Sequence, residues 1–298
     1  MTGYLEGRTV IVTGAGRGLG RAAAEACAGA GANVVVADNG VTVRGESPEA
    51  AVAQEVAAGI AARGGSATAM STSVTTLTGA EQIVSAAVDT YGQLDAVICA
   101  AGILRPNPLH EMTEEEWTGV LAVHLTGTFT MFRAALPAMR ARQTGSLLAY
   151  TSASYVGTVA QPNYSSAKGG IVSLVRSAAL TYRDEGITAN AIAPAAFTRM
   201  MDEAQSWTGP MSLTVKAASN IGQSEDVAPL AVYLVSDRAR HVTGQVYTAN
   251  GNKIAVWNQP REVRSMFASD RWTPEEIERR LDTEISQERM ALMDKGKE

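Results

Sequence analysis

The stretch VIVTGAGRGLGRA, residues 10–22, decides the fold. It joins a short β-branched apolar run to an Ala-rich stretch through four glycines, Gly14, Gly16, Gly18 and Gly20. The apolar run indicates a strand covered on both faces, and the Ala-rich stretch indicates a helix. Glycines at such a junction let the chain turn tightly and bring backbone N–H groups to the helix N-terminus, where a pyrophosphate can bind. The segment therefore predicts a dinucleotide site, with Arg17 and Leu19 among its contacts.

Strand and helix patterns alternate beyond this segment. The predicted strands are Thr9–Val12, Asn33–Ala37, Ala67–Ser71, Ala96–Cys99, Ser146–Thr151, Thr188–Ile192 and Gln245–Thr248. The predicted helices are Gly20–Gly29, Glu49–Arg63, Thr78–Tyr91, Glu114–Arg142, Tyr164–Asp184 and Glu225–Leu234. Alternation of this kind predicts an α/β fold of the Rossmann type, a doubly wound parallel sheet.

The chain is expected to form one domain, residues 1–252, followed by a C-terminal helical extension, residues 253–298. The extension contains Thr273-Pro274-Glu275-Glu276, a helix start with Thr at the N-cap, Pro at N1 and Glu at N3. Ile277, Leu281 and Ile285 then recur on one face. We expect this helix to pack on the body or on a neighbouring subunit.

Bulk composition limits the classes of function. Of the 298 residues, 46% are hydrophobic and 18% charged, which suits a globular enzyme. A net charge of −5 offers no basic field for nucleic acid or an anionic membrane. No apolar run is expected to reach membrane-spanning length, and the N-terminus shows no basic and apolar leader. With Cys27 and Cys99 expected as buried free thiols in a reducing compartment, the prediction is a cytoplasmic protein.

Asp38 and Arg17 bear on the choice of dinucleotide. Asp38 ends the second predicted strand, twenty residues after Gly18. A carboxylate there can accept hydrogen bonds from the adenosine ribose hydroxyls and would repel a 2′-phosphate, which favours NAD. Arg17 favours NADP, because a guanidinium can bind a 2′-phosphate. NAD is the predicted cofactor, and NADP is the alternative.

Tyr164 and Lys168 form the predicted catalytic pair. They are spaced i and i+4 at the start of an apolar helix, so both side chains lie on one face. Acid/base work near neutral pH requires the tyrosine pKa to fall by about three units from about 10, or about 4 kcal/mol of differential stabilisation. A nearby ammonium and a nicotinamide cation can supply it.

These features together resemble the short-chain dehydrogenases/reductases. The resemblance covers residues 8 to about 252 and rests on TGAGRGLG, Asp38, Tyr164-x-x-x-Lys168 and Asn190-Ala-Ile-Ala-Pro194. It implies a single Rossmann-type domain that forms homotetramers or dimers through the helix with the tyrosine. It also implies that Tyr164 donates or accepts the proton, and that Lys168 lowers the tyrosine pKa and binds the nicotinamide ribose.

The resemblance also implies a serine that binds the substrate oxygen, at the end of the fifth strand. Counting along the strand from Gly145 places it at Ser152, whereas counting back from Tyr164 places it at Thr151; Ser152 is preferred. An asparagine usually completes the catalytic group through its backbone carbonyl in a distorted helix. His124 stands in its place, either as a substitute or as a packed histidine.

Further cofactor contacts follow from the resemblance. The family's Asn-Asn-Ala-Gly after the fourth strand is here Cys99-Ala100-Ala101-Gly102, which loses the asparagine side chains. Pro194 to Thr198 should cross the nicotinamide, with Thr198 near the carboxamide. The cofactor contacts expected beyond the glycine loop, Asp38 and the catalytic pair are Ser73, Val74, Ala100, Ala101, Gly102, Pro194, Phe197 and Thr198. No metal site is predicted.

A narrower resemblance concerns the substrate. Three segments carry this resemblance: V-H-L-x-G-x-F around His124, the end of the second strand, and A-P-x-x-x-x-R-M. They are similar to one branch of the family, which contains the (3R)-hydroxyacyl-CoA dehydrogenase of multifunctional β-oxidation enzymes and the 17β-hydroxysteroid dehydrogenase-like proteins. It implies a bulky, apolar secondary alcohol, either a 3-hydroxyacyl-CoA or a hydroxysteroid. Met200, Met201, Trp207, Met211 and Leu213 are expected to line the pocket from a lid. A coenzyme A substrate would need a basic patch, for which Arg44, Arg105, Arg199 and Lys216 are candidates.

The predicted function is therefore hydride transfer between NAD and a secondary alcohol or ketone. One alternative is a sugar-nucleotide epimerase or dehydratase, but their usual T-G-x-x-G-x-x-G spacing is missing. The other is a catalytically silent dinucleotide sensor or scaffold, although such proteins lose the tyrosine or the lysine.

Overall fold

The computed structural model of the chain describes residues 3–198, 221–269 and 271–285. Its centre is one sheet with the strand order β3-β2-β1-β4-β5-β6-β7-β8, in which β1 to β7 are parallel. The strands are β1 (Thr9–Thr13), β2 (Asn33–Ala37), β3 (Ser66–Met70), β4 (Ala96–Cys99), β5 (Gly145–Tyr150), β6 (Ile187–Pro194), β7 (Val246–Asn250) and β8 (Lys253–Val256). The predicted doubly wound α/β fold is confirmed.

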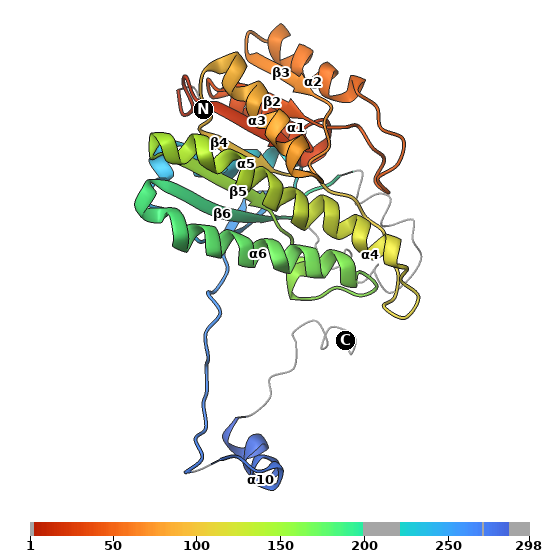
Figure 1. Ribbon diagram of the computed structural model, residues 1–298, viewed down its shortest axis with the longest axis vertical. Helices are drawn as coiled ribbons and strands as arrows, with labels where there is room; N and C mark the ends of the chain where they lie inside the picture. The colour runs from red at the N-terminus through yellow and green to blue at the C-terminus, as the bar shows by residue number, and fades with distance from the viewer. Residues whose placement is uncertain (1–2, 199–220, 270, 286–298) are drawn as a thin grey trace. The chain divides into compact units, whose positions relative to one another are not determined.

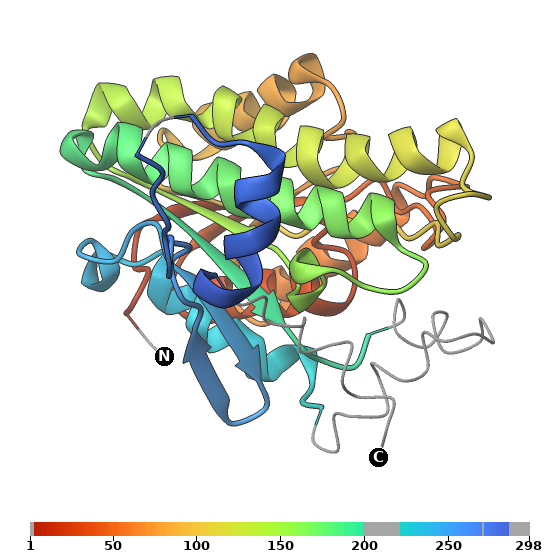
Figure 2. The same ribbon diagram turned by 90° about the horizontal axis from the view of Figure 1, so that it is seen from below.

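Helices cover both faces of this sheet, as the continuously apolar strands require. They are α1 (Gly18–Gly29), α2 (Ala51–Ala62), α3 (Leu77–Tyr91), α4 (Glu114–Leu121), α5 (Gly127–Arg142), α6 (Pro162–Tyr182) and α9 (Ser224–Leu234). Alternate residues of each strand enter two separate cores, one with α1, α2 and α9 and the other with α3, α5 and α6. Figures 1 and 2 show α5 and α6 side by side on one layer.

The strand order fixes where a ligand can bind. From β1 the chain first builds outward through β2 and β3, and then returns to place β4 on the other side of β1. The chain connections that follow β1 and β4 therefore lead away from each other, toward opposite sides of the sheet. This opens a crevice between them at the carboxyl ends of the two strands. The glycine segment at the end of β1 lies at this crevice.

The helix over residues 114–142 is interrupted by a π-helical turn, Ala122–Thr126. The sequence predicted one unbroken helix, Glu114–Arg142, because apolar residues continue on both sides of the turn and no glycine–proline break marks it. By length and composition this helix could cross a membrane, whereas the sequence was expected to contain no apolar run of membrane-spanning length. Half of its most apolar window is buried inside the protein. It contacts α3, α6 and β4, as a core helix does.

The chain divides into two compact units, Met1–Trp257 and Asn258–Glu298. Residues 253–256 were expected to belong to the extension, but they form β8, antiparallel to β7. The second unit contains α10 (Pro274–Glu284), whose N-cap Thr273 accepts a hydrogen bond from the Glu276 N–H at 3.2 Å. The predicted helix start is thus confirmed.

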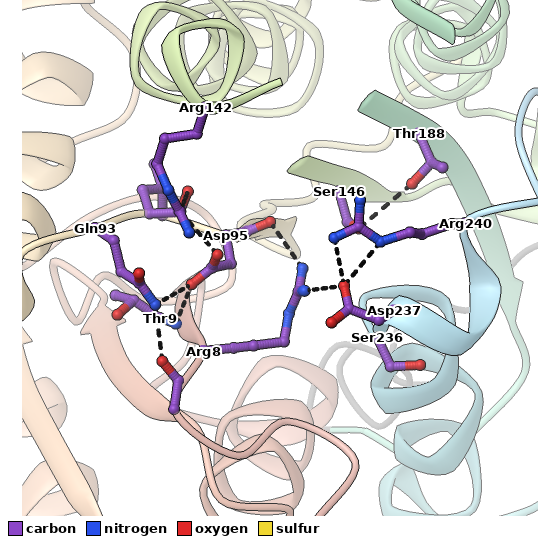
Figure 3. A network of polar contacts seen from close by, with 12 residues as sticks. Arg8, Thr9, Gln93, Asp95, Arg142, Ser146, Thr188, Ser236, Asp237 and Arg240 are labelled. Atoms are coloured by element: carbon purple, nitrogen blue, oxygen red, sulfur yellow. Dashed lines mark hydrogen bonds and ion pairs between the residues drawn. The ribbon is translucent and has the colours of Figure 1, made fainter. Parts of the chain in front are cut away.

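A charge network occupies the amino-terminal edge of the sheet (Figure 3). The buried Asp95 precedes β4 and accepts hydrogen bonds from the Thr9 N–H at 2.8 Å, the Gln93 amide at 2.9 Å and the Arg142 guanidinium at 2.8 Å. Arg8 joins this group to Asp237 and donates to the Asp95 carbonyl at 3.3 Å. The network ties β1 and β4 to α5 and to the turn after α9.

Candidate active site

A cavity of about 420 Å³ opens at the carboxyl ends of the strands. Its walls come from the ends of β1, β2, β4 and β5 and from α4 and α6. The expected site residues that line it are Gly14, Arg17, Gly18, Leu19, Gly20, Asp38, Ser73, Val74, Ala100, Ala101, Gly102, His124, Tyr164, Lys168, Pro194 and Thr198. Gly16, Ser152 and Phe197 are not among the lining residues, and Phe197 is 45% exposed.

The glycine loop has the geometry that a pyrophosphate requires. Gly14 has φ +65°, and a Cβ there would overlap the backbone of Ala101 at 2.6 Å. Only glycine therefore allows β1 and β4 to approach this closely. Helix α1 begins at Gly18 without a side-chain cap on its first N–H groups, which leaves them for an anion. The loop thus fits a dinucleotide phosphate group.

Asp38 is held at the cavity wall by two backbone donors. Its carboxylate accepts hydrogen bonds from the Gly16 N–H at 2.8 Å and the Gly40 N–H at 2.7 Å. Gly16 thereby acts on the site through Asp38 although it does not line the cavity. The carboxylate is fixed beside the glycine loop, where the adenosine ribose of a dinucleotide would lie.

Arg17 reaches into the loop after β2. Its guanidinium lies 3.4 Å from the Gly40 and Val41 carbonyls and 3.7 Å from the Glu49 carboxylate. The charged partner of the Arg17 guanidinium is therefore a carboxylate, that of Glu49.

Small residues at the end of β4 form the floor of the cavity. Thr13 Oγ1 accepts hydrogen bonds from the N–H groups of Ala100 at 3.3 Å and Ala101 at 3.4 Å. The polar bonding expected to be lost with the family's asparagines is therefore partly supplied from β1. Ser73 Oγ bonds the Thr75 hydroxyl at 3.0 Å on the opposite wall.

The two candidate hydroxyls at the end of β5 have different partners. The buried Thr151 donates to the Lys168 carbonyl at 2.9 Å, so its hydroxyl is used in joining β5 to α6. Burial raises the pKa of Tyr164, whereas the Ser152 side chain acts to lower it, and the Ser152 Oγ accepts a hydrogen bond from the Ser154 N–H at 3.2 Å. Ser152 thus acts on the tyrosine hydroxyl, whereas Thr151 is the one of the two that lines the cavity.

Lys168 and Tyr164 lie together in the cavity. The ammonium lies 5.5 Å from the centre of the Tyr164 ring and donates to the Tyr150 carbonyl at 2.6 Å. Burial lowers the pKa of Lys168 to about 7. Burial also raises the pKa of Tyr164, against a lowering effect of the Ser152 hydrogen bond. The lowering that acid/base work requires must therefore come from the lysine charge and a bound nicotinamide, because burial in the protein alone raises the pKa of Tyr164.

His124 lies in the π turn, at the position for which the sequence left two roles open, a substitute for asparagine and a packed histidine. Its ring meets the Tyr164 ring edge-on with centroids 5.2 Å apart, and a Cβ on Gly102 would overlap the imidazole. Nε2 lies 2.8 Å from the Ile103 carbonyl oxygen, while the buried Nδ1 has no hydrogen-bond partner among the described residues. Burial first, and then the charge of Lys168, hold the pKa of His124 well below its usual value, so the ring is neutral. Its backbone carbonyl accepts from the Thr128 hydroxyl at 2.7 Å.

Some expected residues fall outside the described part of the chain. These are the lid residues Met200, Met201, Trp207, Met211 and Leu213 and the basic candidates Arg199 and Lys216. Of the other basic candidates, Arg105 lines the cavity, but its guanidinium bonds the Arg44 and Glu115 carbonyls at 3.0 and 3.1 Å and the Glu115 carboxylate at 3.2 Å.

Sequence reasoning missed a strap, residues 39–50, that forms one wall of the cavity through Val41, Val43 and Gly45. The Leu104 N–H donates to the Val43 carbonyl at 2.8 Å, which joins the strap to the segment after β4. The signal for a loop was present in Asn39-Gly40 and Pro48, but it does not indicate where the loop packs.

The fold, the glycine loop and the tyrosine–lysine pair define a dinucleotide-binding oxidoreductase. A sequence model of the family described as enoyl-(acyl carrier protein) reductase matches residues 14–251. The chain therefore belongs to the short-chain dehydrogenase/reductase family, as the resemblance predicted.

Individual relatives agree. A short-chain type dehydrogenase/reductase of Mycobacterium tuberculosis is 39% identical over 84% of this chain and 84% of its own. Peroxisomal multifunctional enzyme type 2 of Mus musculus is 41% identical over 66% of this chain, which matches 26% of that enzyme. The 3-oxoacyl-[acyl-carrier-protein] reductase of Staphylococcus aureus is 34% identical over 82% of this chain and 97% of its own. The crystal structure of a short chain dehydrogenase from Mycobacterium avium superposes with a TM-score of 0.83 at 35% identity, covering 97% and 98% of the two chains.

Proposed function

We propose that this protein is an NAD-dependent dehydrogenase/ketoreductase that interconverts a secondary alcohol and a ketone. The observation that carries the proposal is that Tyr164 and Lys168 line the same cavity as Gly14, Gly18 and Gly20 of the glycine loop, with Ser152 beside the tyrosine hydroxyl. A bound nicotinamide dinucleotide supplies the hydride acceptor or donor. The protein supplies orientation and proton transfer.

In the proposed mechanism, the hydroxyl of Ser152 orients the oxygen of the substrate, and Tyr164 exchanges the proton with it. For alcohol oxidation, the Tyr164 oxygen must be a phenolate that accepts the proton. The Lys168 ammonium, 5.5 Å from the ring centre, stabilises that phenolate and opposes the effect of burial on the tyrosine pKa. His124 completes the group through its backbone carbonyl in the π turn.

NAD is proposed over NADP because the ribose end of the cavity is acidic. A 2′-phosphate there would face the Asp38 carboxylate, and Glu49 lies nearby. Arg17, which the sequence named as the feature favouring NADP, faces Glu49 and the strap carbonyls. NADP remains the alternative that the assay below distinguishes.

The proposed substrate is a bulky, apolar secondary alcohol, namely a 3-hydroxyacyl-CoA or a hydroxysteroid. The name of the S. aureus relative, a 3-oxoacyl-[acyl-carrier-protein] reductase, supports the acyl class. Arg105 gives less support to a coenzyme A patch, since Glu115 already pairs with it. A steroid is therefore kept as a second substrate for the assay.

We further propose a cytoplasmic homo-oligomer, a tetramer or dimer, that binds no nucleic acid or membrane. Phe129 and Leu180 support the oligomer, because these large apolar side chains on α5 and α6 are 47% and 73% exposed. The buried free thiols of Cys27 and Cys99 support a reducing compartment.

The test is absorbance at the reduced-nicotinamide band, with NAD and NADP separately, across acyl-CoA, steroid and simple secondary alcohols. We expect NAD-dependent turnover that falls about 1,000-fold in Tyr164→Phe while dinucleotide binding is kept. Tyr182→Phe, at the far end of the same helix, is the matched control and should keep full activity.

Three outcomes would contradict parts of the proposal. Preference for NADP would overturn the interpretation of Asp38. Turnover that survives Tyr164→Phe would overturn the assigned acid/base. Saturable dinucleotide binding without turnover on any alcohol class would favour the silent sensor or scaffold.

A further inference from the structure

Asn163, the residue before Tyr164, is a buried polar side chain that the mechanism does not use. It is 0% exposed and is the second residue of α6, between Pro162 and the tyrosine. It does not line the cavity, so it touches neither substrate nor dinucleotide directly. A buried amide in the first turn of a helix must satisfy two donor hydrogens and an acceptor oxygen.

All three of its hydrogen bonds go to backbone. Nδ2 donates to the Arg105 carbonyl at 2.9 Å and to the Glu116 carbonyl at 2.9 Å. Oδ1 accepts from the Tyr164 N–H at 2.7 Å. The partners fix the orientation of the amide, because two are acceptors and the third is a donor. One side chain thus joins three segments of chain.

Each of these segments carries part of the candidate site. Glu116 lies on α4, which runs directly into the π turn with His124. The segment with Arg105 begins at Ile103, whose carbonyl contacts His124 Nε2 at 2.8 Å, and bonds the strap through Leu104. Tyr164 itself is the third partner. Asn163 therefore fixes the tyrosine backbone to the two segments that surround its ring.

The anchors at the other ends are themselves held. The Arg105 side chain is fixed by the Arg44 and Glu115 carbonyls at 3.0 and 3.1 Å. The start of α4 is fixed by a capping box between Thr113 and Glu116. A displacement of the first turn of α6 would therefore move Tyr164 relative to His124 and to Lys168, which Tyr150 and Thr151 hold one turn further on.

We infer that Asn163 is a positioning residue for the proposed reaction, holding Tyr164 at its working distance from Lys168, Ser152 and the substrate oxygen. This inference rests on the proposed function. A misplacement of about 1 Å can lower a rate about 100-fold, even when the altered residue is away from the chemistry.

The test compares Asn163→Ala with a matched control, Asn190→Ala. Asn190 is also buried, donates to the Val242 carbonyl at 2.8 Å and accepts from the Gln245 N–H at 3.0 Å, but joins β6 to the start of β7. Both variants should lose comparable stability in urea. Only Asn163→Ala should lower kcat, by about 10- to 100-fold, with the KM for NAD unchanged.

The pH profile supplies a readout that lost stability does not move. A tyrosine that has moved from Lys168 is a weaker acid, so the acidic limb of kcat for alcohol oxidation should shift to higher pH in Asn163→Ala. The limb should stay in place in Asn190→Ala.

Asn163→Asp tests which bonds matter. It keeps the acceptor for the Tyr164 N–H but replaces both donors with an oxygen that faces two carbonyls, so it should lose as much kcat as Asn163→Ala. Asn163→Ser keeps one donor, is the milder variant if the alanine form does not fold, and should retain an intermediate kcat.

The inference is overturned if Asn163→Ala matches Asn190→Ala in kcat and pH profile, or if Asn163→Asp keeps full kcat. Failure of the proposed function is a distinct result, because it would show in the wild-type protein as activity that is missing or insensitive to Tyr164→Phe.

Discussion

At the amino-terminal edge of the sheet, the carboxylate of Asp95 is surrounded by three donors at 2.8–2.9 Å, one of them a guanidinium. At the carboxyl-terminal edge, the equally buried Lys168 has one neutral carbonyl partner at 2.6 Å, and burial lowers its pKa to about 7. Both edges belong to the same strands, yet one charge is compensated and the other is not. A compensated charge supports folding, whereas an uncompensated one remains available to act on a neighbouring group.

Replacing the uncompensated charge should give the largest effect. Lys168→Met removes the cation beside Tyr164, so we expect kcat to fall about 1,000-fold, equivalent to about 4 kcal/mol. Steady-state kinetics measure this loss. Activity within a few-fold of wild type would show that the ammonium does not act on the tyrosine.

The same variant should change how stability depends on pH. The pKa of Lys168 is lowered from 10.5 in the unfolded chain to about 7 in the folded protein, so between these values only the unfolded chain holds the proton. The free energy of unfolding contributed by this group therefore rises with pH across that window, and below pH 7 the penalty of the buried charge is fully present. Lys168→Met should show its greatest advantage over wild type at pH 6 and a smaller one at pH 10, measured by urea unfolding.

A substitution at the amino-terminal edge, where the charge is compensated, should lower the stability and leave the activity unchanged. Asp95→Asn weakens the Arg142 bond and places an amide among three donors, and we expect a loss of about 3 kcal/mol in the free energy of unfolding. The kcat of the folded enzyme should be unchanged. Asp184→Asn is the control, because its ion pair with Arg183 is exposed and its loss should change stability by less than about 0.5 kcal/mol. A large kcat loss in Asp95→Asn would show that the two edges are not independent.

The smallest effect concerns the close packing at the carboxyl edge. Gly102→Ala places a methyl group against the imidazole of His124, which we expect to cost about 2 kcal/mol and to lower kcat. Gly29→Ala is the matched control, since a Cβ at the end of α1 meets nothing within 4 Å and should be neutral or stabilising. Equal behaviour of the two variants would mean that the His124 ring moves away freely.

The sequence predicted those features that depend on local patterns. The strands Asn33–Ala37 and Ala96–Cys99 were predicted with the bounds that the structure shows, because short apolar runs between polar turns allow one register. The glycine loop and the Tyr164–Lys168 spacing are local patterns in the same sense, and Gly14, Gly18 and Gly20 line the cavity together with Tyr164 and Lys168.

Features that depend on distant partners were missed or left open. Asn163 carries no local signal, since its carbonyl partners lie 58 and 47 residues away in sequence. Ser152 was preferred over Thr151 from the count along the strand, and both stayed open because both are hydroxyl residues at the end of a strand. The Thr151 hydroxyl donates to the Lys168 carbonyl, a partner that no local pattern indicates. The strand Lys253–Val256 was missed because it is short and pairs only with β7.

The π turn at Ala122–Thr126 sets the rotational phase between the two halves of a long helix. In a regular helix each residue turns the next side chain by about 100°, so one residue more or fewer redirects everything beyond it. Here α4 faces α6 and the cavity, whereas α5 faces α3 in the core. Deleting one residue from this turn would therefore rotate the apolar face of α5 towards solvent. A point substitution can change the side chain at position 124, but it does not remove the π turn. Removing the turn would change the register of the whole helix.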